Sequence, residues 1–144
     1  MSKLDKNTLS GLVVSQAMRR QVVQLIKDTT ITNSINALIK YKVNALLTTD
    51  QSGQPVGVLS KTDIMSAYYA SLPIDSPIED IMSKPPLFCN PEDALDKALQ
   101  IMHSQRIYRL YVIDSENNNV VGALAYPDIV GLLYKCCHDS EYSN

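Results

Sequence analysis

Three polar side chains that could bind a ligand follow a short apolar run in the first half of the chain. Ser60, Thr62 and Asp63 come directly after a predicted strand at 56–59 and begin a predicted helix. A helix that starts after a sheet strand presents unpaired backbone N–H groups and a partial positive charge, which suit a phosphate. The two hydroxyls add donors, and an ionised Asp63 accepts hydrogen bonds from the paired hydroxyls of a ribose. The alternative is that Ser60 and Asp63 only cap the helix.

These residues belong to a segment that occurs twice. The run 57–64 (GVLSKTDI) recurs as 122–129 (GALAYPDI), so that Asp128 lies 65 positions after Asp63. Upstream the match continues at an offset of 64 in two further pairs of segments, 17–18 with 81–82 and 43–50 with 107–114. The extra residue falls in the polar turns, where loops absorb insertions. The duplication predicts two similar units packed about a pseudo-twofold axis, with paired clefts between them.

The apolar pattern of each copy predicts a strand, a helix, two strands and a closing helix. We therefore expect an α+β fold of two β-α-β-β-α repeats. In the first copy the strands are expected at 22–25, 45–48 and 56–59, and the closing helix at 62–70. The first helix is expected to turn Ile31, Ile35, Leu38 and Ile39 toward the core. A capped turn is expected at 76–82, and a leading helix at about 7–18.

The second copy follows the same order. Its strands are expected at 87–89, 110–113 and 120–124. Asp93 is a candidate N-cap for the first helix of this copy. Pro127 suits the first turn of the closing helix, which is expected to run to about Tyr134.

Composition excludes several classes of protein. The chain has 144 residues, 45% of them hydrophobic, and a net charge of −2, which predicts one compact globular unit without a nucleic-acid footprint. No apolar run approaches a membrane span. Three cysteines make no even disulfide framework, so we expect a reducing cytoplasm.

Catalytic and metal chemistry are also disfavoured. The chain has two histidines and no Ser/His/Asp or Cys/His set, and its five glycines form no phosphate loop of the Walker kind. Cys136, Cys137 and His138 are adjacent, but no CxxC pair accompanies them, so we expect no metal site. The sequence therefore predicts a protein that is not an enzyme.

The duplicated motifs resemble a tandem pair of cystathionine-β-synthase (CBS) domains, a Bateman module, over about residues 13–135. Each copy has a short x-Met turn, an apolar strand, a helix, a second strand ending in Asp, and the G-h-h-x-x-x-D-h run, where h is apolar. The resemblance implies a first repeat at 13–70, a linker at 71–77 and a second repeat at 78–135. It also implies a sensor without chemistry of its own, which takes AMP, ADP, ATP or another adenosyl ligand as effector.

The second repeat departs from this pattern. Ala125 and Pro127 replace the two hydroxyl residues of the first repeat, whereas Asp128 is retained. Arg109 lies before the core strand, where it resembles a phosphate-binding residue of the γ subunit of AMP-activated protein kinase; the first repeat has Ala45 there. The other interpretation of Arg109 is a surface residue at a strand start. Two unequal sites, or one good site, are expected.

The predicted function is a regulatory module whose nucleotide occupancy, in a cleft between the repeats, changes the geometry of a homodimer. We expect the dimer because four apolar positions of the closing helices would face outward: Ile64, Tyr68, Ile129 and Leu133. The alternative is a structural dimerisation module without a ligand. The identity of the adenosyl ligand, the occupancy of one or both clefts, and a regulated enzyme or effector domain outside this chain stay open, as does whether the chain is a fragment.

Overall fold

The chain forms two compact units rather than the single one that its composition predicted, and each is built around one three-stranded sheet. The computed structural model describes residue 4 and residues 8–142, the last five of these without side chains. The first-repeat unit comprises Val22–Pro86, and the second-repeat unit comprises Met1–Gln21 together with Leu87–Asn144. The compact units therefore divide the chain differently from the sequence repeats. Residues 13–21 pack in the second-repeat unit, and residues 78–86 pack in the first-repeat unit.

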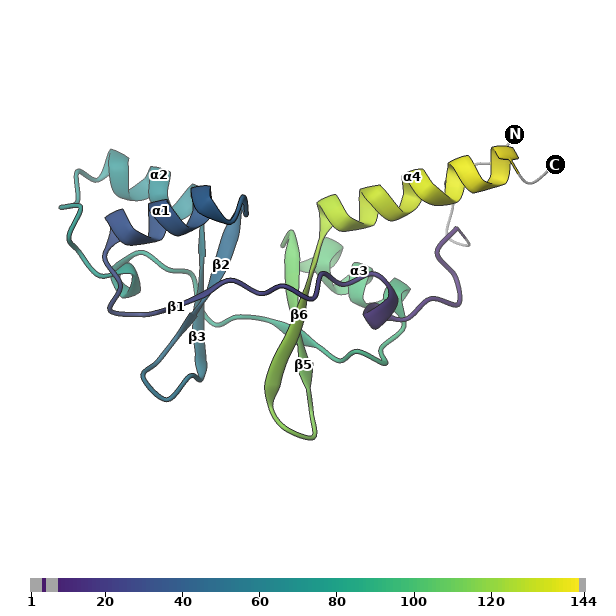
Figure 1. Cartoon of the computed structure of the whole chain (residues 1–144), viewed down its shortest axis with the longest axis horizontal. Coiled ribbons are helices and arrows are strands. Elements are labelled where there is room, and N and C mark those ends of the chain that lie inside the picture. The colour runs from purple at the N-terminus through teal and green to yellow at the C-terminus, as the bar shows by residue number, and fades with distance from the viewer. Residues whose placement is uncertain (1–3, 5–7, 143–144) are drawn as a thin grey trace. The chain divides into compact units, whose positions relative to one another are not determined.

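The first-repeat unit has the expected order of elements (Figure 1). They are β1 (Gln24–Ile26), α1 (Ile31–Lys40), β2 (Ala45–Thr49), β3 (Pro55–Ser60), α2 (Lys61–Tyr69) and a 3-10 turn, η2 (Ile78–Asp80). β2 lies at the centre of the sheet, parallel to β1 and antiparallel to β3. The helices α1 and α2 lie side by side. The core of this unit contains four large buried side chains: Leu38, Leu46, Leu59 and Ile78.

The second-repeat unit repeats this arrangement. Its elements are a 3-10 turn, η1 (Val14–Gln16), β4 (Phe88–Cys89), α3 (Leu95–Gln105), β5 (Arg109–Asp114), β6 (Asn119–Ala125) and α4 (Tyr126–Tyr142). β5 is central, parallel to β4 and antiparallel to β6. The bulge between Val112 and Ile113 falls 64 positions after the bulge between Thr48 and Thr49. The predicted α+β fold with two β-α-β-β-α repeats is confirmed.

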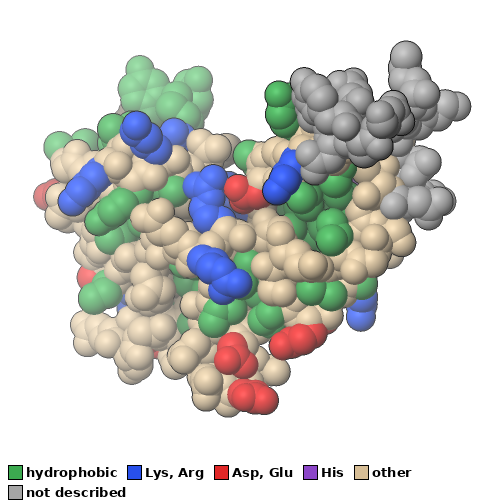
Figure 2. Space-filling view, turned by 45° about the vertical axis from the view of Figure 1, so that its right-hand side comes forward, with side chains coloured by type: hydrophobic (Ala, Val, Ile, Leu, Met, Phe, Trp, Pro, Cys, Tyr) green, Lys and Arg blue, Asp and Glu red, His purple; other side chains and the backbone are tan. Residues whose placement is uncertain are grey.

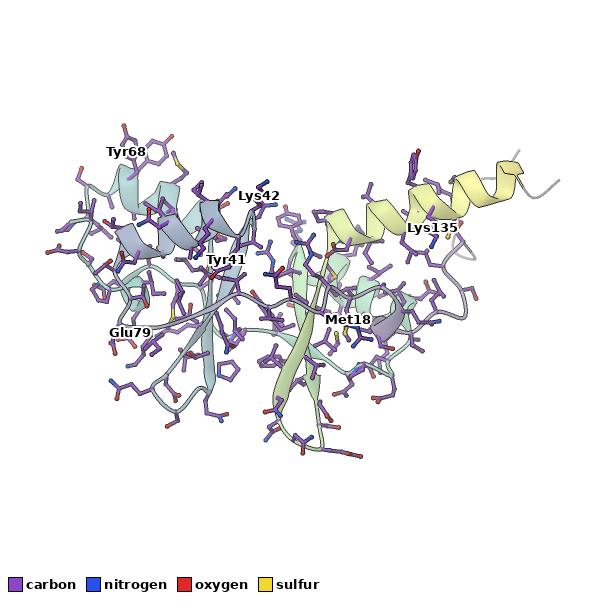
Figure 3. The ribbon with its side chains drawn as sticks, in the orientation of Figure 1. Met18, Tyr41, Lys42, Tyr68, Glu79 and Lys135 are labelled. Carbon is purple, nitrogen blue, oxygen red and sulfur yellow. The ribbon has the colours of Figure 1, made fainter. Side chains whose placement is uncertain are left out.

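A methionine covers a glycine in the third strand of each sheet. Gly57 in β3 lies under Met82, and Gly122 in β6 lies under Met18, which Figure 3 shows beside β6. The residue after each methionine pairs with the strand in a short antiparallel bridge, Ser83 with Val58 and Arg19 with Ala123. A side chain on either glycine would occupy the space of the methionine. The two glycines therefore allow each x-Met segment to lie flat on its sheet.

Several local predictions were wrong. The leading helix is absent from residues 8–18, where the structure has a turn and η1; its first residue, Asn7, lies outside the described residues. Asp93 does not cap α3, because its carboxylate accepts the N–H of Asn90 at 2.9 Å and the N-cap residue is Ala94. The turn expected at 76–82 is not capped as predicted. Pro77 is the N-cap residue of η2, and within the described residues no side chain forms a cap hydrogen bond there. The closing helix α4 extends beyond Tyr134 to Tyr142.

The buried side of α1 also differs from the expectation. Ile31 and Leu38 are buried as predicted, but Ile35 is exposed and Ile39 is 65% exposed. Ser34 and Ala37 take the buried positions. Ser34 is accommodated in the core because its hydroxyl donates to the carbonyl oxygen of Ile31 at 2.7 Å.

The closing helices do not turn all four expected apolar residues outward. Tyr68 is 72% exposed and points away from the first-repeat sheet (Figure 3), but Ile129 is 5% exposed and belongs to the core. Ile64 and Leu133 are half-buried against their own cores. The expectation was wrong for Ile129, because α4 directs this position toward its sheet. Other apolar residues of α2 and the loop after it are exposed: Met65, Tyr69, Leu72 and Ile74.

Candidate functional site

The start of α2 holds three of the predicted site residues in one hydrogen-bonded arrangement. Ser60 is the N-cap residue, and its hydroxyl oxygen accepts the N–H of Asp63 at 3.2 Å. The Asp63 carboxylate reaches back through Oδ2, which accepts the Ser60 N–H at 2.9 Å and lies 3.1 Å from the Ser60 hydroxyl. This reciprocal pair is a capping box. Thr62 lies between them and is exposed.

The second carboxylate oxygen of Asp63 has a partner from a distant segment. Oδ1 accepts the hydroxyl of Ser83 at 3.2 Å. An ionised carboxylate has about four lone-pair sites, and these contacts use three of them. Asp63 is half-buried, so a ligand could reach the remaining site. Ser60 and Asp63 therefore cap α2, and the contacts of the Asp63 carboxylate leave one of its lone-pair sites unused.

The corresponding residue of the second repeat is held differently. Asp128 lies in the first turn of α4, and its Oδ1 forms an ion pair with Nη2 of Arg19 at 3.1 Å. Ala125 and Pro127 have no hydroxyl, so the reciprocal serine contact of the first repeat has no equivalent here. The carboxylate side chain is 20% exposed. The guanidinium of Arg19 thus contacts Asp128, whereas the hydroxyl of Ser83 contacts Asp63.

Arg109 lies at the same end of the second sheet as Asp128. It is the first residue of β5 and pairs in register with Ala125, the last residue of β6. The backbone N–H of Tyr126, which begins α4, donates to the carbonyl oxygen of Tyr108 at 3.2 Å. The start of β5 and the first turn of α4 are therefore adjacent. In the first-repeat unit the paired position is the buried Ala45, opposite Ser60.

The five predicted site residues thus fall into two groups. Ser60, Thr62 and Asp63 come together in the first-repeat unit. Arg109 and Asp128 belong to the second-repeat unit.

Two residues at these sites were missed or undervalued. Ser83 was not predicted, and Arg19 was not among the expected site residues. Both follow the methionine of an x-Met segment, and they are 64 positions apart. Extending the repeat alignment by one residue beyond Met18 and Met82 would have brought this pair to notice.

Among residues 4 and 8–137, whose side chains the structure describes, no group of three or more His, Cys, Asp or Glu could hold a metal ion. Every helix within these residues is too short or too polar to cross a membrane.

Comparisons with known proteins agree with the duplicated architecture. The CBS domain family matches residues 14–70 and 78–135. The chain is 29% identical over 117 residues to the CBS domain-containing protein YhcV of Bacillus subtilis, covering 81% of each chain. It is 26% identical over 112 residues to inosine-5'-monophosphate dehydrogenase of Methanocaldococcus jannaschii, covering 77% of this chain and 21% of that enzyme. The chain spans 21–26% of the length of five curated relatives.

A solved structure resembles the whole fold. A CBS domain protein from Pyrobaculum aerophilum, complexed with AMP, superposes with a TM-score of 0.77 at 25% sequence identity, covering 88% of this chain and 99% of that chain. The two matched segments, the repeated sheets and this superposition lead to one conclusion: the chain belongs to the CBS domain family and contains two CBS domains.

Proposed function

We propose that the chain is a regulatory module without catalytic activity, which binds an adenosine-containing nucleotide at the sites marked by Asp63 and Asp128. The observation that carries the proposal is the recurrence of a half-buried aspartate in the first turn of a helix that starts directly from a sheet strand. An aspartate in this place can accept ribose hydroxyls while the helix end faces a phosphate. The AMP complex of the Pyrobaculum aerophilum protein supports an adenosyl ligand.

The residues of the two sites have distinct roles in this proposal. Asp63 accepts a ribose hydroxyl at its remaining lone-pair site, and Thr62 offers a hydroxyl donor beside the start of α2. The single O–H of Ser60 donates to Asp63, so Ser60 serves the ligand as a donor only when it gives up this hydrogen bond. In the second repeat Asp128 takes the ribose role. Arg109 supplies a guanidinium for phosphate oxygens, which it can contact through two parallel N–H groups.

One observation favours the alternative, a structural dimerisation module without a ligand. Asp63 already accepts three hydrogen bonds, and Asp128 already forms an ion pair, so each has a structural role without any nucleotide. The two functions differ in what an adenosyl ligand does to stability. A ligand that binds only the folded chain at a hundredfold excess over its Kd stabilises it by about 2.7 kcal/mol.

Thermal melting with AMP, ADP, ATP, NAD and S-adenosylmethionine, followed by calorimetry, tests the proposal. Asp63→Ala should weaken binding on the order of tenfold, because hydrogen bonds to a charged group contribute about 1.5–3 kcal/mol. This variant also loses the capping box, which destabilises by about 0.5–2 kcal/mol. Thr30→Ala is the matched control, since Thr30 caps α1 of the same unit through the Asn33 N–H at 3.2 Å. It should lower stability without changing affinity. If none of these ligands raises the melting temperature while the chain still forms a dimer, the result favours the structural alternative.

The proposal includes transmission through a homodimer. Exposed apolar residues, several of them visible in Figure 2, provide surface that a second copy would bury. Met65, Tyr68 and Tyr69 on α2 are the residues we assign to this contact. Sedimentation should give twice the 16.0 kDa chain mass, and ligand should change the scattering profile of the dimer. A monomer at tens of micromolar would rule the contact out. The regulated partner is an enzyme or effector domain, in the reducing cytoplasm that the odd number of cysteines favours.

A further inference from the structure

The two repeats differ in the residue that holds the aspartate proposed to bind ribose. In the first repeat the partner of Asp63 is the neutral hydroxyl of Ser83, at 3.2 Å. In the second repeat the partner of Asp128 is the guanidinium of Arg19, at 3.1 Å. The two partners occupy equivalent positions, each directly after the methionine of an x-Met segment. The difference between the sites is therefore one of charge at a shared position.

The backbone of Arg19 is held firmly in this place. Its N–H donates to the carbonyl oxygen of Ala123 at 2.8 Å, and the N–H of Ala123 donates back to the Arg19 carbonyl oxygen at 2.9 Å. Met18, the preceding residue, is packed over Gly122 in β6. The guanidinium is attached to a fixed strand edge, while its side chain is 49% exposed and can contact a ligand.

The ion pair changes what the second site offers to a ligand. It neutralises the carboxylate of Asp128, so an incoming phosphate meets no net negative charge. A guanidinium has five N–H donors, and the contact with Oδ1 uses one of its two terminal nitrogens. Its remaining donors can reach phosphate oxygens. An uncharged adenosyl ligand gains nothing from these donors and must share Asp128 with Arg19.

A second difference between the repeats also favours a phosphorylated ligand at the second site. The first residue of the central strand is Arg109 in the second repeat and the buried Ala45 in the first. Lys61, two residues before Asp63, is exposed at the start of α2 and forms no ion pair with it within the described residues, whereas Arg19 contacts Asp128 directly. Both substituted positions therefore place a guanidinium in the second repeat and a neutral side chain in the first.

We propose that Arg19 is a specificity-determining residue, which makes the Asp128 site select phosphorylated adenosyl ligands over uncharged ones, whereas the Asp63 site lacks this selection. This inference rests on the proposed nucleotide-binding function. The measured quantity is the ratio of the Kd for adenosine to the Kd for AMP at each site.

Exchange of the two partner residues tests the inference by calorimetry. The second site is measured in Asp63→Ala protein, and the first site in Asp128→Ala protein. Arg19→Ser should lower the adenosine-to-AMP ratio of the second site about tenfold, the effect of one charge-assisted hydrogen bond. Ser83→Arg should raise the ratio of the first site. Arg19→Lys keeps the charge without the planar fork and should fall between the two. Arg20→Ser removes the same charge from the next residue, which is exposed, and should leave both ratios unchanged.

The outcomes separate this inference from the function on which it rests. If the unmodified chain binds AMP but Arg19→Ser leaves the second-site ratio unchanged, the inference fails and the nucleotide-binding function stands. Equal effects of Arg19→Ser and Arg20→Ser would also overturn it, because general charge would then explain the selection. If Asp63→Ala alone abolishes all binding, the second site takes no ligand, so the inference fails and only a one-site module remains. If the unmodified chain binds neither ligand, the proposed function itself is wrong.

Discussion

Replacing Gly57 by alanine should destabilise the first-repeat unit and disturb the Asp63 site. A Cβ on Gly57 would lie 2.6 Å from Sδ of Met82 and 2.9 Å from the carbonyl oxygen of Ser83, both under the 3.0 Å that real Cβ contacts respect. The methionine side chain can rotate away. The Ser83 backbone cannot move as freely, because it exchanges two hydrogen bonds with Val58, at 2.8 and 2.9 Å.

The size of the effect follows from this geometry. Inserting a methyl group into a closely packed site costs about 1–3 kcal/mol. Displacement of Ser83 would also weaken its hydrogen bond to Asp63, so adenosyl affinity should fall together with stability. Gly57→Ala should therefore lower the free energy of unfolding by about 1–3 kcal/mol. Chemical denaturation followed by circular dichroism measures the loss.

Gly131→Ala is the matched control for this substitution. Gly131 lies within α4, and nothing is within 4 Å of its added Cβ. Alanine has a higher helix propensity than glycine, so this variant should have a free energy of unfolding that is higher by about 0.5–1 kcal/mol. Combining Gly57→Ala with Met82→Ala should recover part of the loss through the space that the sulfur vacates. Unchanged stability of Gly57→Ala would refute the proposed close approach of the x-Met segment to β3.

Two further predictions concern the stability of the cores. Thr48 is fully buried and, within the described residues, its Oγ1 has no hydrogen-bond partner, while the second repeat has Val112 at this position. Thr48→Val should raise the free energy of unfolding by about 1 kcal/mol in urea denaturation, and a decrease would reveal a partner for the hydroxyl. Burial raises the pKa of the Cys89 thiol from 9.0 to about 11 and the pKa of Tyr111 from 10.0 to about 12. The unfolded chain loses these protons first, so stability should fall as pH rises from 9 to 12. Tyr111→Phe should flatten the part of this decline above pH 10, and an unchanged slope would contradict the assignment.

The order of the elements could be predicted from the sequence because it depends on local patterns. The strands carry continuous or alternating apolar residues, and each of these patterns occurs in both copies. The face that α1 buries was less predictable. Ile35 and Ile39 have the apolar character of core residues, but the helix turns Ser34 and Ala37 inward. That orientation depends on how the helix meets its sheet, which side-chain spacing within the helix does not specify.

By itself the sequence determined that the chain contains two copies of one unit, that Asp63 and Asp128 occupy equivalent places in them, and that only the first copy keeps its hydroxyls. Those facts need nothing beyond residue order, because caps and strand ends are formed by neighbours in the chain. The partners of the two carboxylates were decided by the tertiary structure. Ser83 lies 20 residues from Asp63, and Arg19 lies 109 residues from Asp128. Each pair meets only because an x-Met segment lies across a glycine on the third strand, and a contact between such distant segments exists only once the sheet has formed.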